Sequence, residues 1–274
     1  MTVSRQLRLL SYNIQAGVGT QRYHEYVTHG WKHLLPHRQQ RDNLGNIGDL
    51  VRCFDLVGLQ EVDGGSLRSG FMDQTEYLAQ LSSFPHWYTQ TNRRLGKIAH
   101  HSLGVLSRIP FAHIEEVRLP GAIPGRGALM LRLGGEANPL IVTVVHLALG
   151  RRARRLQIAH LGRLLRDYRY VVLMGDLNCG ANSPEFRDLL DATRLCRLPL
   201  ADNTFPSWRP VRGIDHVLAS PGLRVVGAEV LSMKASDHLP IAVELEIPAE
   251  IALGDATSAD AVVAATHSRA RMLA

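Results

Sequence analysis

The sequence predicts an α/β protein in which short strands outnumber helices. The clearest strand is the apolar, β-branched run at residues 141–145, and similar short runs recur at roughly regular spacing. Segments with helix-starting residues lie between some of these runs, such as Ser183 followed by Pro184. The 274 residues, 45% hydrophobic and 20% charged, suit one large domain or two small ones and can bury a substantial core.

The first two predicted strands both end in polar side chains. The strand at residues 7–13 ends at Asn13, beside a glycine-bearing loop. The strand at residues 55–63 has an apolar centre followed by Gln60 and Glu61. Both strands therefore place polar groups where a site at a sheet edge would need them.

A long polar loop is expected at residues 18–41, between these strands. Loops of this length inside compact domains are more often functional than idle. Its histidines at positions 29, 33 and 37 have helical spacing, but Pro36 interrupts them and no carboxylate or cysteine joins them. A substrate-facing or solvated loop is therefore favoured over a metal site.

The other elements follow from the same patterns. Helices are expected at about residues 42–53, 73–81 and 150–168 and from residue 184. Strands are expected near residue 87 and at about residues 103–106, 112–118, 128–133, 140–145, 171–175, 213–218, 225–231 and 241–247. Residues 1–247 are assigned to the folded domain, and residues 248–274 to an Ala-rich tail.

The helix at residues 150–168 opens with four arginines, at positions 151, 152, 154 and 155. Positive charge in a first helical turn opposes the helix dipole. The cluster is either a solvated basic face or a place where an anion, from substrate or membrane phosphate, offsets that cost.

The segment at residues 171–178 is a buried strand that stops at Gly175. Gly175 permits a sharp turn, after which Asp176 and Asn178 project together from the carboxyl end of the strand. An acid and an amide in this position suit a group that accepts a proton or faces a metal, beside a phosphate-contacting donor. On this segment alone, Asp176 could equally be the cap of the next helix.

Composition limits the partners and the compartment. The formal charge of +6 favours anionic partners, although it also serves simple solubility. Three cysteines without a CxxC pair argue against a disulfide framework or a zinc ribbon and fit a reducing compartment. No apolar run is long enough to span a bilayer and no signal peptide is visible, so a cytoplasmic location is expected. The protein is also expected to be a monomer.

Polar groups of one chemical kind recur at strand ends and in the adjoining turns. They are Asn13, Glu61, His146, Asp176, Asn178, Asp215, Asp237 and His238. Oxygen ligands without cysteine select Mg²⁺ or Mn²⁺ over zinc. Carboxylates and two imidazoles around such an ion match phosphoester hydrolysis. No GxSxG, P-loop or dinucleotide motif offers another chemistry.

The ordered motifs resemble the endonuclease/exonuclease/phosphatase superfamily over about residues 7–247. They are Ser11-Tyr12-Asn13-Ile14, Leu59-Gln60-Glu61-Val62, Val105-Leu106-Ser107-Arg108, His146-Leu147, Gly175-Asp176-Leu177-Asn178, Thr204-Phe205-Pro206, Ile214-Asp215-His216-Val217 and Ser236-Asp237-His238-Leu239-Pro240. The resemblance implies a four-layer α/β/β/α sandwich of two mixed sheets, like that of pancreatic-type deoxyribonucleases. It also implies a site at one edge of the sandwich.

The resemblance assigns roles around a metal and its water. Glu61 looks like the main metal ligand, and Asn13 and Asp237 are candidates to complete the site directly or through water. Asp176 resembles the residue that orients or deprotonates the attacking water.

A second set of roles concerns the phosphate. His238 resembles the imidazole bound to the transferring phosphoryl group, oriented by Asp215. His146 resembles a second phosphate-side imidazole, and Asn178 a phosphate contact. The chain departs from the family at residues 102–104, so the partner of the second histidine is not assignable.

Three arginines are the candidate substrate-binding residues. Arg126 falls where small bacterial members of the superfamily often carry a comparable Arg-Gly pair, as a phosphate contact or a structural residue. Arg151 and Arg154 come from the basic cluster.

The substrate is less well defined than the reaction. The charge and the basic cluster favour a nucleic-acid phosphodiesterase. The alternatives are a phospholipid or inositol-phosphate phosphoesterase and, in another class, a non-catalytic phosphate-binding module.

Overall fold

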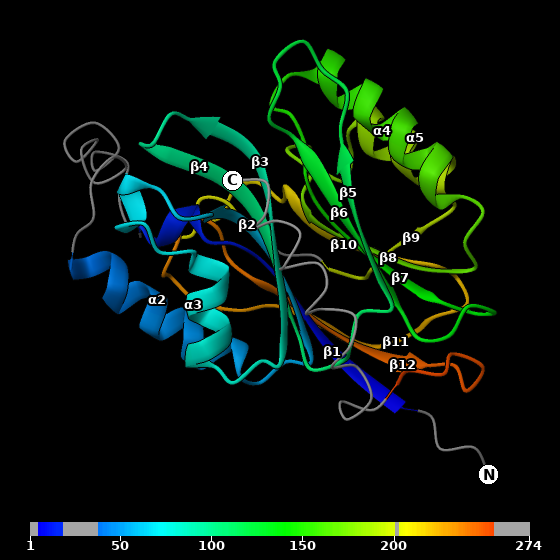
Figure 1. The fold of residues 1–274 in the computed structure, drawn as a ribbon. Coiled ribbons are helices and arrows are strands. Elements are labelled where there is room, and N and C mark those ends of the chain that lie inside the picture. Colours follow the sequence, from blue (N-terminus) through cyan, green and yellow to red (C-terminus); the bar gives the residue numbers. More distant parts are fainter. Residues whose placement is uncertain (1–4, 19–37, 201–202, 255–274) are drawn as a thin grey trace.

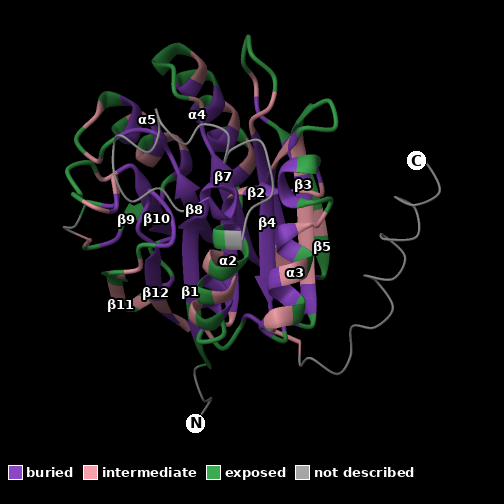
Figure 2. Ribbon diagram, turned by 90° about the vertical axis from the view of Figure 1, so that its left-hand side faces the viewer, coloured by how far each residue is buried: buried purple, intermediate pink, exposed green. Residues whose placement is uncertain are grey.

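Two six-stranded β-sheets pack face to face in the middle of the protein (Figures 1 and 2). The computed structural model describes residues 5–18, 38–200 and 203–254. The order in the first sheet is β11 (Arg224–Val230), β12 (Ile241–Ile247), β1 (Arg5–Asn13), β2 (Leu56–Asp63), β4 (Ala99–Ser107) and β3 (His86–Leu95). The order in the second is β5 (His113–Arg118), β6 (Gly127–Leu133), β7 (Leu140–His146), β8 (Tyr170–Asp176), β10 (Asp215–Ala219) and β9 (Cys196–Arg197).

Helices cover the outer face of each sheet and complete four layers (Figure 1). Helices α2 (Arg38–Val51) and α3 (Gln74–Leu81) lie on the first sheet. Helices α4 (Arg151–Leu165) and α5 (Pro184–Thr193) lie on the second. The four-layer α/β/β/α sandwich predicted from the sequence is therefore confirmed.

Three apolar layers hold the sandwich together. The central layer lies between the sheets, where residues such as Leu9 and Val105 meet residues such as Val142 and Val172. Each outer layer joins one sheet to its helices. In α2 the fully buried residues Leu44, Ile47 and Val51 follow one another at helical spacing, so one apolar stripe of the helix faces the sheet. Figure 2 shows the exposed residues mainly on helix faces and loops.

Both sheets contain one parallel strand pair near their centre. Strand β1 runs parallel to β2, and β7 runs parallel to β8, whereas the other pairings are antiparallel. The carboxyl ends of a parallel pair meet at the same sheet edge. This topology brings together residues that are more than a hundred positions apart in the sequence.

Helices α3 and α5 begin at capping residues that the sequence contains. Helix α3 begins after Asp73, whose carboxylate accepts the backbone N–H groups of Thr75 and Glu76. Helix α5 begins after Ser183 in the same manner, with its hydroxyl accepting the N–H of Phe186.

Several predicted boundaries differ. Helix α2 begins at Arg38, earlier than the predicted cap at residues 42–43, so it takes over the end of the expected loop. The two-residue strand β9 and two short 3₁₀ turns, η1 (Gln15–Gly17) and η3 (Leu67–Ser69), carry no sequence pattern long enough to predict them. The histidines at positions 29, 33 and 37 lie outside the described residues.

The first residues after β12 pack against the domain. Ile251 is a member of the central apolar layer, and the Tyr170 hydroxyl donates to the Glu250 carboxylate over 2.5 Å. Residues 255–274 of the predicted tail lie outside the described part of the chain. Among the described helices, none combines the length and apolar character needed to cross a bilayer.

Candidate active site

The predicted polar residues converge at one edge of the sandwich. Asn13 ends β1, His146 ends β7 and Asp176 ends β8, while Glu61 lies near the end of β2. The two parallel pairings bring these ends to one edge, where His146 is directly opposite Asp176.

Two antiparallel strands contribute from their beginnings. Strand β10 runs antiparallel to β8, so its first residue, Asp215, is opposite Asp176. Strand β12 runs antiparallel to β1, and the turn just before it carries Asp237 and His238. Antiparallel direction therefore brings the start of each strand to the edge where β1 and β8 end.

Unusual backbone conformations aim the side chains. Gly175 has a φ of 143°, and a Cβ there would lie 1.9 Å from the carbonyl oxygen of Val145, so only glycine fits. Glu61 has a φ of 54° in a bulge where the pairing of β2 with β4 shifts register. Asn178 has a φ of 52°. Such outliers gather where structure holds functional side chains in place.

Asp176 is the centre of the arrangement. Its Oδ2 lies 3.4 Å from Nε2 of His146 and 4.0 Å from Nε2 of His238, and accepts a hydrogen bond of 3.4 Å from Asn13 Nδ2. Its Oδ1 accepts the backbone N–H of Asn178 over 2.9 Å. Burial, followed by the charge of Asp215, raises the pKa of Asp176 to about 7, against the opposing effect of His238. A carboxyl group with this pKa can exchange protons near neutral pH.

His238 is held as a cation by a buried acid. Its Nδ1 donates to Oδ2 of Asp215 over 2.8 Å, and Thr204 Oγ1 donates to the same oxygen over 2.5 Å. The Phe205 ring packs beside the imidazole with centroids 4.9 Å apart. Burial alone would lower the pKa of His238, but the charge and hydrogen bond of Asp215 outweigh it and raise this pKa to about 10. Its Nε2 is left to face Asp176.

His146 is the neutral counterpart of His238. Burial, together with the charges of Arg126 and His238, holds the pKa of His146 well below its usual range. Its Nε2 lies 3.8 Å from Oε1 of Glu61 as well as close to Asp176. The neutral ring offers one N–H donor to a bound oxygen.

Asn178 and Asp237 flank this group. Asn178 Nδ2 donates to the carbonyl of Leu147 over 3.0 Å, which leaves the second amide hydrogen for another acceptor. Asp237 is buried, and its Oδ1 accepts a hydrogen bond of 3.2 Å from the Ser236 hydroxyl.

The donor set fits a hard divalent cation. Glu61 offers a partly buried carboxylate, and its loss of solvent together with the charge of Asp237 raises its pKa. A cation would relieve this unfavourable crowding of negative charge, and oxygen donors without thiolate suit Mg²⁺ or Mn²⁺. One oxygen of Asp176, one of Asp215 and a nitrogen of His238 also lie within 4.8 Å of one another. The short hydrogen bond between His238 and Asp215 favours Glu61 as the ligand instead.

Arg126 lines a pocket of about 810 Å³ that Glu61 and His146 also line. Burial lowers the pKa of Arg126 below its ordinary value, although the nearby charges of Glu61 and Asp176 act in the opposite direction. Arg126 therefore lies in the same pocket as Glu61 and His146, and its contact with substrate phosphate stays a prediction.

The arginine of the α4 cluster that lines the pocket is not one of the two that were predicted to bind substrate. Arg154 is buried and donates to the Glu185 carboxylate and to the carbonyls of Ala148 and Leu149, which are contacts within the fold. Arg151 donates to Glu185 over 3.0 Å. It is Arg152, in the same cluster, that lines the pocket.

Sequence reasoning gave no role to several residues of the site. Thr204 holds Asp215, and the Thr-Phe-Pro motif was the available signal for it. Arg93 and Asn92 line the pocket from β3, and no sequence pattern marks them. His101, for which the sequence suggested a place in a substrate loop, also lines the pocket. Burial and the charges of three arginines lower its pKa to about 4, so it is neutral.

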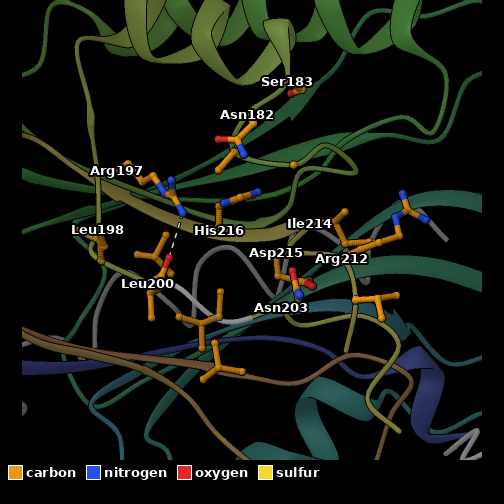
Figure 3. A pocket seen from close by; sticks show the side chains of 17 residues that line it. Asn182, Ser183, Arg197, Leu198, Leu200, Asn203, Arg212, Ile214, Asp215 and His216 are labelled. Atoms are coloured by element: carbon orange, nitrogen blue, oxygen red, sulfur yellow. Dashed lines mark hydrogen bonds between the residues drawn. The ribbon is translucent and has the colours of Figure 1, made fainter. Parts of the chain in front are cut away.

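A second pocket, of about 390 Å³, lies beside Asp215 (Figure 3). Arg197, Arg212, Asn182 and His216 are among its lining residues, and it shares none with the larger pocket. Arg197 donates to the carbonyl of Leu200 over 3.0 Å, the dashed line in Figure 3. Glu61 and His146 open into the larger pocket instead, so that pocket is the candidate substrate site.

Solved structures of similar fold come from several bacteria. An endonuclease/exonuclease/phosphatase from Beutenbergia cavernae is 22% identical, with a TM-score of 0.71 over 89% of this chain and 72% of its own. A mannosyl-6-phosphatase from Bacteroides thetaiotaomicron is 17% identical, with a TM-score of 0.63 over 87% and 99%. Sphingomyelinase C from Streptomyces griseocarneus is 17% identical, with a TM-score of 0.61 over 88% and 99%. At these identities the likeness shows the fold.

The sequence comparisons show the family. Among curated proteins, no sequence matches the chain. A model of the endonuclease/exonuclease/phosphatase family matches residues 10–238, which include all eight polar residues predicted at strand ends and turns. The chain therefore belongs to the endonuclease/exonuclease/phosphatase family.

Proposed function

We propose that this protein is a divalent-metal-dependent phosphoester hydrolase in which Asp176 activates the attacking water. The proposal is carried by one observation. A buried carboxylate with a raised pKa lies between a neutral imidazole, His146, and an imidazole held as a cation, His238. This arrangement combines a proton acceptor with two donors for phosphate oxygens.

Each of these residues would have its own role in one in-line displacement at phosphorus. Asp176 accepts a proton from water, whose oxygen forms the new bond to phosphorus as the bond to the leaving oxygen breaks. The imidazolium of His238 and the N–H of His146 donate to the phosphoryl oxygens, which gain charge in the transition state. The leaving oxygen takes a proton from solvent, and Asp176 returns its own to solvent.

Glu61 would hold the Mg²⁺ or Mn²⁺ ion, with Asn13 and Asp237 as further oxygen donors nearby. When bound, the ion supplies positive charge that neutralises the phosphate and favours ionised water. Arg126 adds a fixed positive charge on the pocket side. The three free cysteines support the predicted cytoplasmic, reducing setting.

Two substrate classes are candidates. A nucleic-acid phosphodiester, favoured by the sequence, is supported by the charge of +6 and by Arg93, Arg126 and Arg152 in the pocket. A phospholipid or inositol-phosphate ester is supported by the apolar part of the same pocket, where Ile123 and Leu149 stand exposed.

A substrate screen tests the reaction and its class together. Plasmid DNA, single-stranded RNA, phospholipid vesicles and inositol phosphates are offered side by side with Mg²⁺. Hydrolysis of DNA or RNA supports the nucleic-acid candidate. A preparation that is active on lipid and inactive on both nucleic acids rules it out.

Two substitutions separate an enzyme from a non-catalytic phosphate-binding module. Hydrolysis of bis-p-nitrophenyl phosphate should fall by about 10²- to 10⁴-fold in Asp176→Asn and His238→Ala, the usual scale for lost acid–base catalysis. If wild type shows no hydrolysis above the level of the two variants, the binding module is the better account.

A further inference from the structure

Part of the lining of the substrate pocket is aliphatic and open to solvent. Three of its side chains are large and exposed: Ile123 by 73%, Leu149 by 76% and Leu156 by 52%. They come from the loop between β5 and β6, the loop after β7, and α4. The first loop passes beside α4, where Gly121 faces Ala153 and Gln157 (Figure 1). The three side chains thus form one surface, which we call the aliphatic rim.

Uncompensated positive charge lies beside the aliphatic rim. Arg93 and Arg152 line the same pocket, and neither has a carboxylate partner among the described residues. By contrast, Arg151, Arg154 and Arg155 each pair with an acid on α5. Basic groups beside exposed aliphatic side chains complement a surface that is apolar beneath and anionic at its headgroups.

The side chains that line the pocket favour a lipid surface over a nucleic acid as the anionic partner of these arginines. Proteins that bind single-stranded nucleic acid stack the bases on aromatic side chains. The pocket has no Phe, Tyr or Trp among its lining residues, and its apolar members are Leu103, Ala122, Ile123, Pro124, Ala148, Leu149, Ala153 and Leu156. Aliphatic surface of this kind suits acyl or other hydrocarbon groups.

We propose that the pocket takes a lipid phosphoester from an anionic membrane surface, against which the aliphatic rim docks. The phosphate would lie at the Glu61, His146 and Arg126 end, and the apolar part of the lipid along Ile123, Leu149 and Leu156. This inference rests on the proposed phosphoester hydrolysis and names its substrate class. The reaction adds water across one phosphorus–oxygen bond of the lipid and releases an alcohol and a phosphate ester.

The test uses the full chain with phosphatidylglycerol/phosphatidylcholine vesicles and with phosphatidylcholine vesicles alone. Wild type should co-sediment with the anionic vesicles and release a phosphorus-containing product from them when Mg²⁺ is present. The double variant Ile123→Ser, Leu149→Ser should partition at least about tenfold less, because two aliphatic side chains no longer leave water. Val226→Ser is the matched control, because Val226 is an exposed aliphatic residue on β11 that lines neither pocket.

Hydrolysis of soluble bis-p-nitrophenyl phosphate is measured in the same preparations. Vesicle hydrolysis should fall at least tenfold more than soluble hydrolysis in the double variant, and both should be unchanged in Val226→Ser. Wild type that hydrolyses the soluble ester but neither binds nor hydrolyses the vesicles overturns the lipid inference alone. Wild type that hydrolyses nothing overturns the proposed function as well.

Two further outcomes would give the aliphatic rim a different partner and overturn the inference. One is cleavage of DNA or RNA that depends on Ile123 and Leu149, without binding to anionic vesicles. The other is self-association that the double substitution abolishes, again without vesicle binding, as measured by analytical ultracentrifugation.

Discussion

The Nδ1 atom of His238 lies 2.8 Å from Oδ2 of Asp215, and both side chains are buried. This contact keeps His238 cationic despite its burial. The substitution Asp215→Asn removes the charge and should lower the pKa of His238 by about one to three units. The alkaline limb of the kcat/KM profile should move to lower pH by a similar amount, measured with bis-p-nitrophenyl phosphate. Asp188→Asn, which removes an exposed partner of Arg155, should leave the profile unchanged.

The wild-type enzyme should have a bell-shaped dependence of kcat/KM on pH. Activity requires Asp176 without its proton, so it rises as pH passes the raised pKa of about 7. It also requires His238 with its proton, so it falls as pH passes about 10. Because positive charge favours the carboxylate, the acid limb should move to lower pH as Mg²⁺ approaches saturation. An acid limb at the same pH at all Mg²⁺ concentrations would contradict a cation close to Asp176.

Removal of the Glu61 charge should weaken binding of the cation. Loss of an outer partner of a metal ligand already costs about 10- to 100-fold in affinity, and a direct ligand should cost at least as much. In Glu61→Gln, the Mg²⁺ concentration for half-maximal activity should therefore rise at least tenfold. Titration calorimetry with Mn²⁺ should show the same loss without substrate. Glu116→Gln, on the exposed strand β5, is the matched control and should titrate like wild type.

Gly175 should be irreplaceable for steric reasons. In Gly175→Ala the new Cβ would overlap the carbonyl of Val145, at a φ that other residues rarely adopt. The free energy of unfolding, measured in urea, should fall by more than about 2 kcal/mol. Gly45→Ala is the control, because a Cβ there meets nothing within 4 Å in helix α2. That change should raise the free energy of unfolding by about 0.5–1 kcal/mol.

The predictable part of the fold is the part with strong local periodicity. The last strand was predicted at residues 241–247, and the structure has Ile241–Ile247, because apolar residues alternate with Glu244 and Glu246 up to the turn at Pro248. Helix α2 was predicted to begin several residues too late, since its first turn has no strong cap residue. Strand β9 has two residues and forms because β10 offers an open edge, which a short window of sequence cannot show.

The candidate site was likewise predictable only in part: its motif residues were, and its arginines were not. The motif residues Asp176, His238 and Asp215 were predicted from their positions in ordered segments, and the structure brings them together. The arginines were harder, because side-chain direction on a helix depends on what packs against it. Arg154 turns inward to Glu185 on α5, whereas Arg152 faces the pocket. A cluster of four arginines in sequence does not distinguish these directions.

The kinds of reactive groups, and the elements that carry them, could be predicted from the residues alone. Polar residues at strand ends and turns were enough to predict oxygen ligands and two imidazoles, and the resemblance of the ordered motifs to a known family implied the four-layer sandwich. The protonation states of those groups depend on how the folded chain packs around them. Burial and the neighbouring charges make His146 neutral and His238 cationic, although both are histidines at element ends. The aliphatic rim is likewise a tertiary feature, because its three side chains come from separate segments that packing alone brings to one pocket.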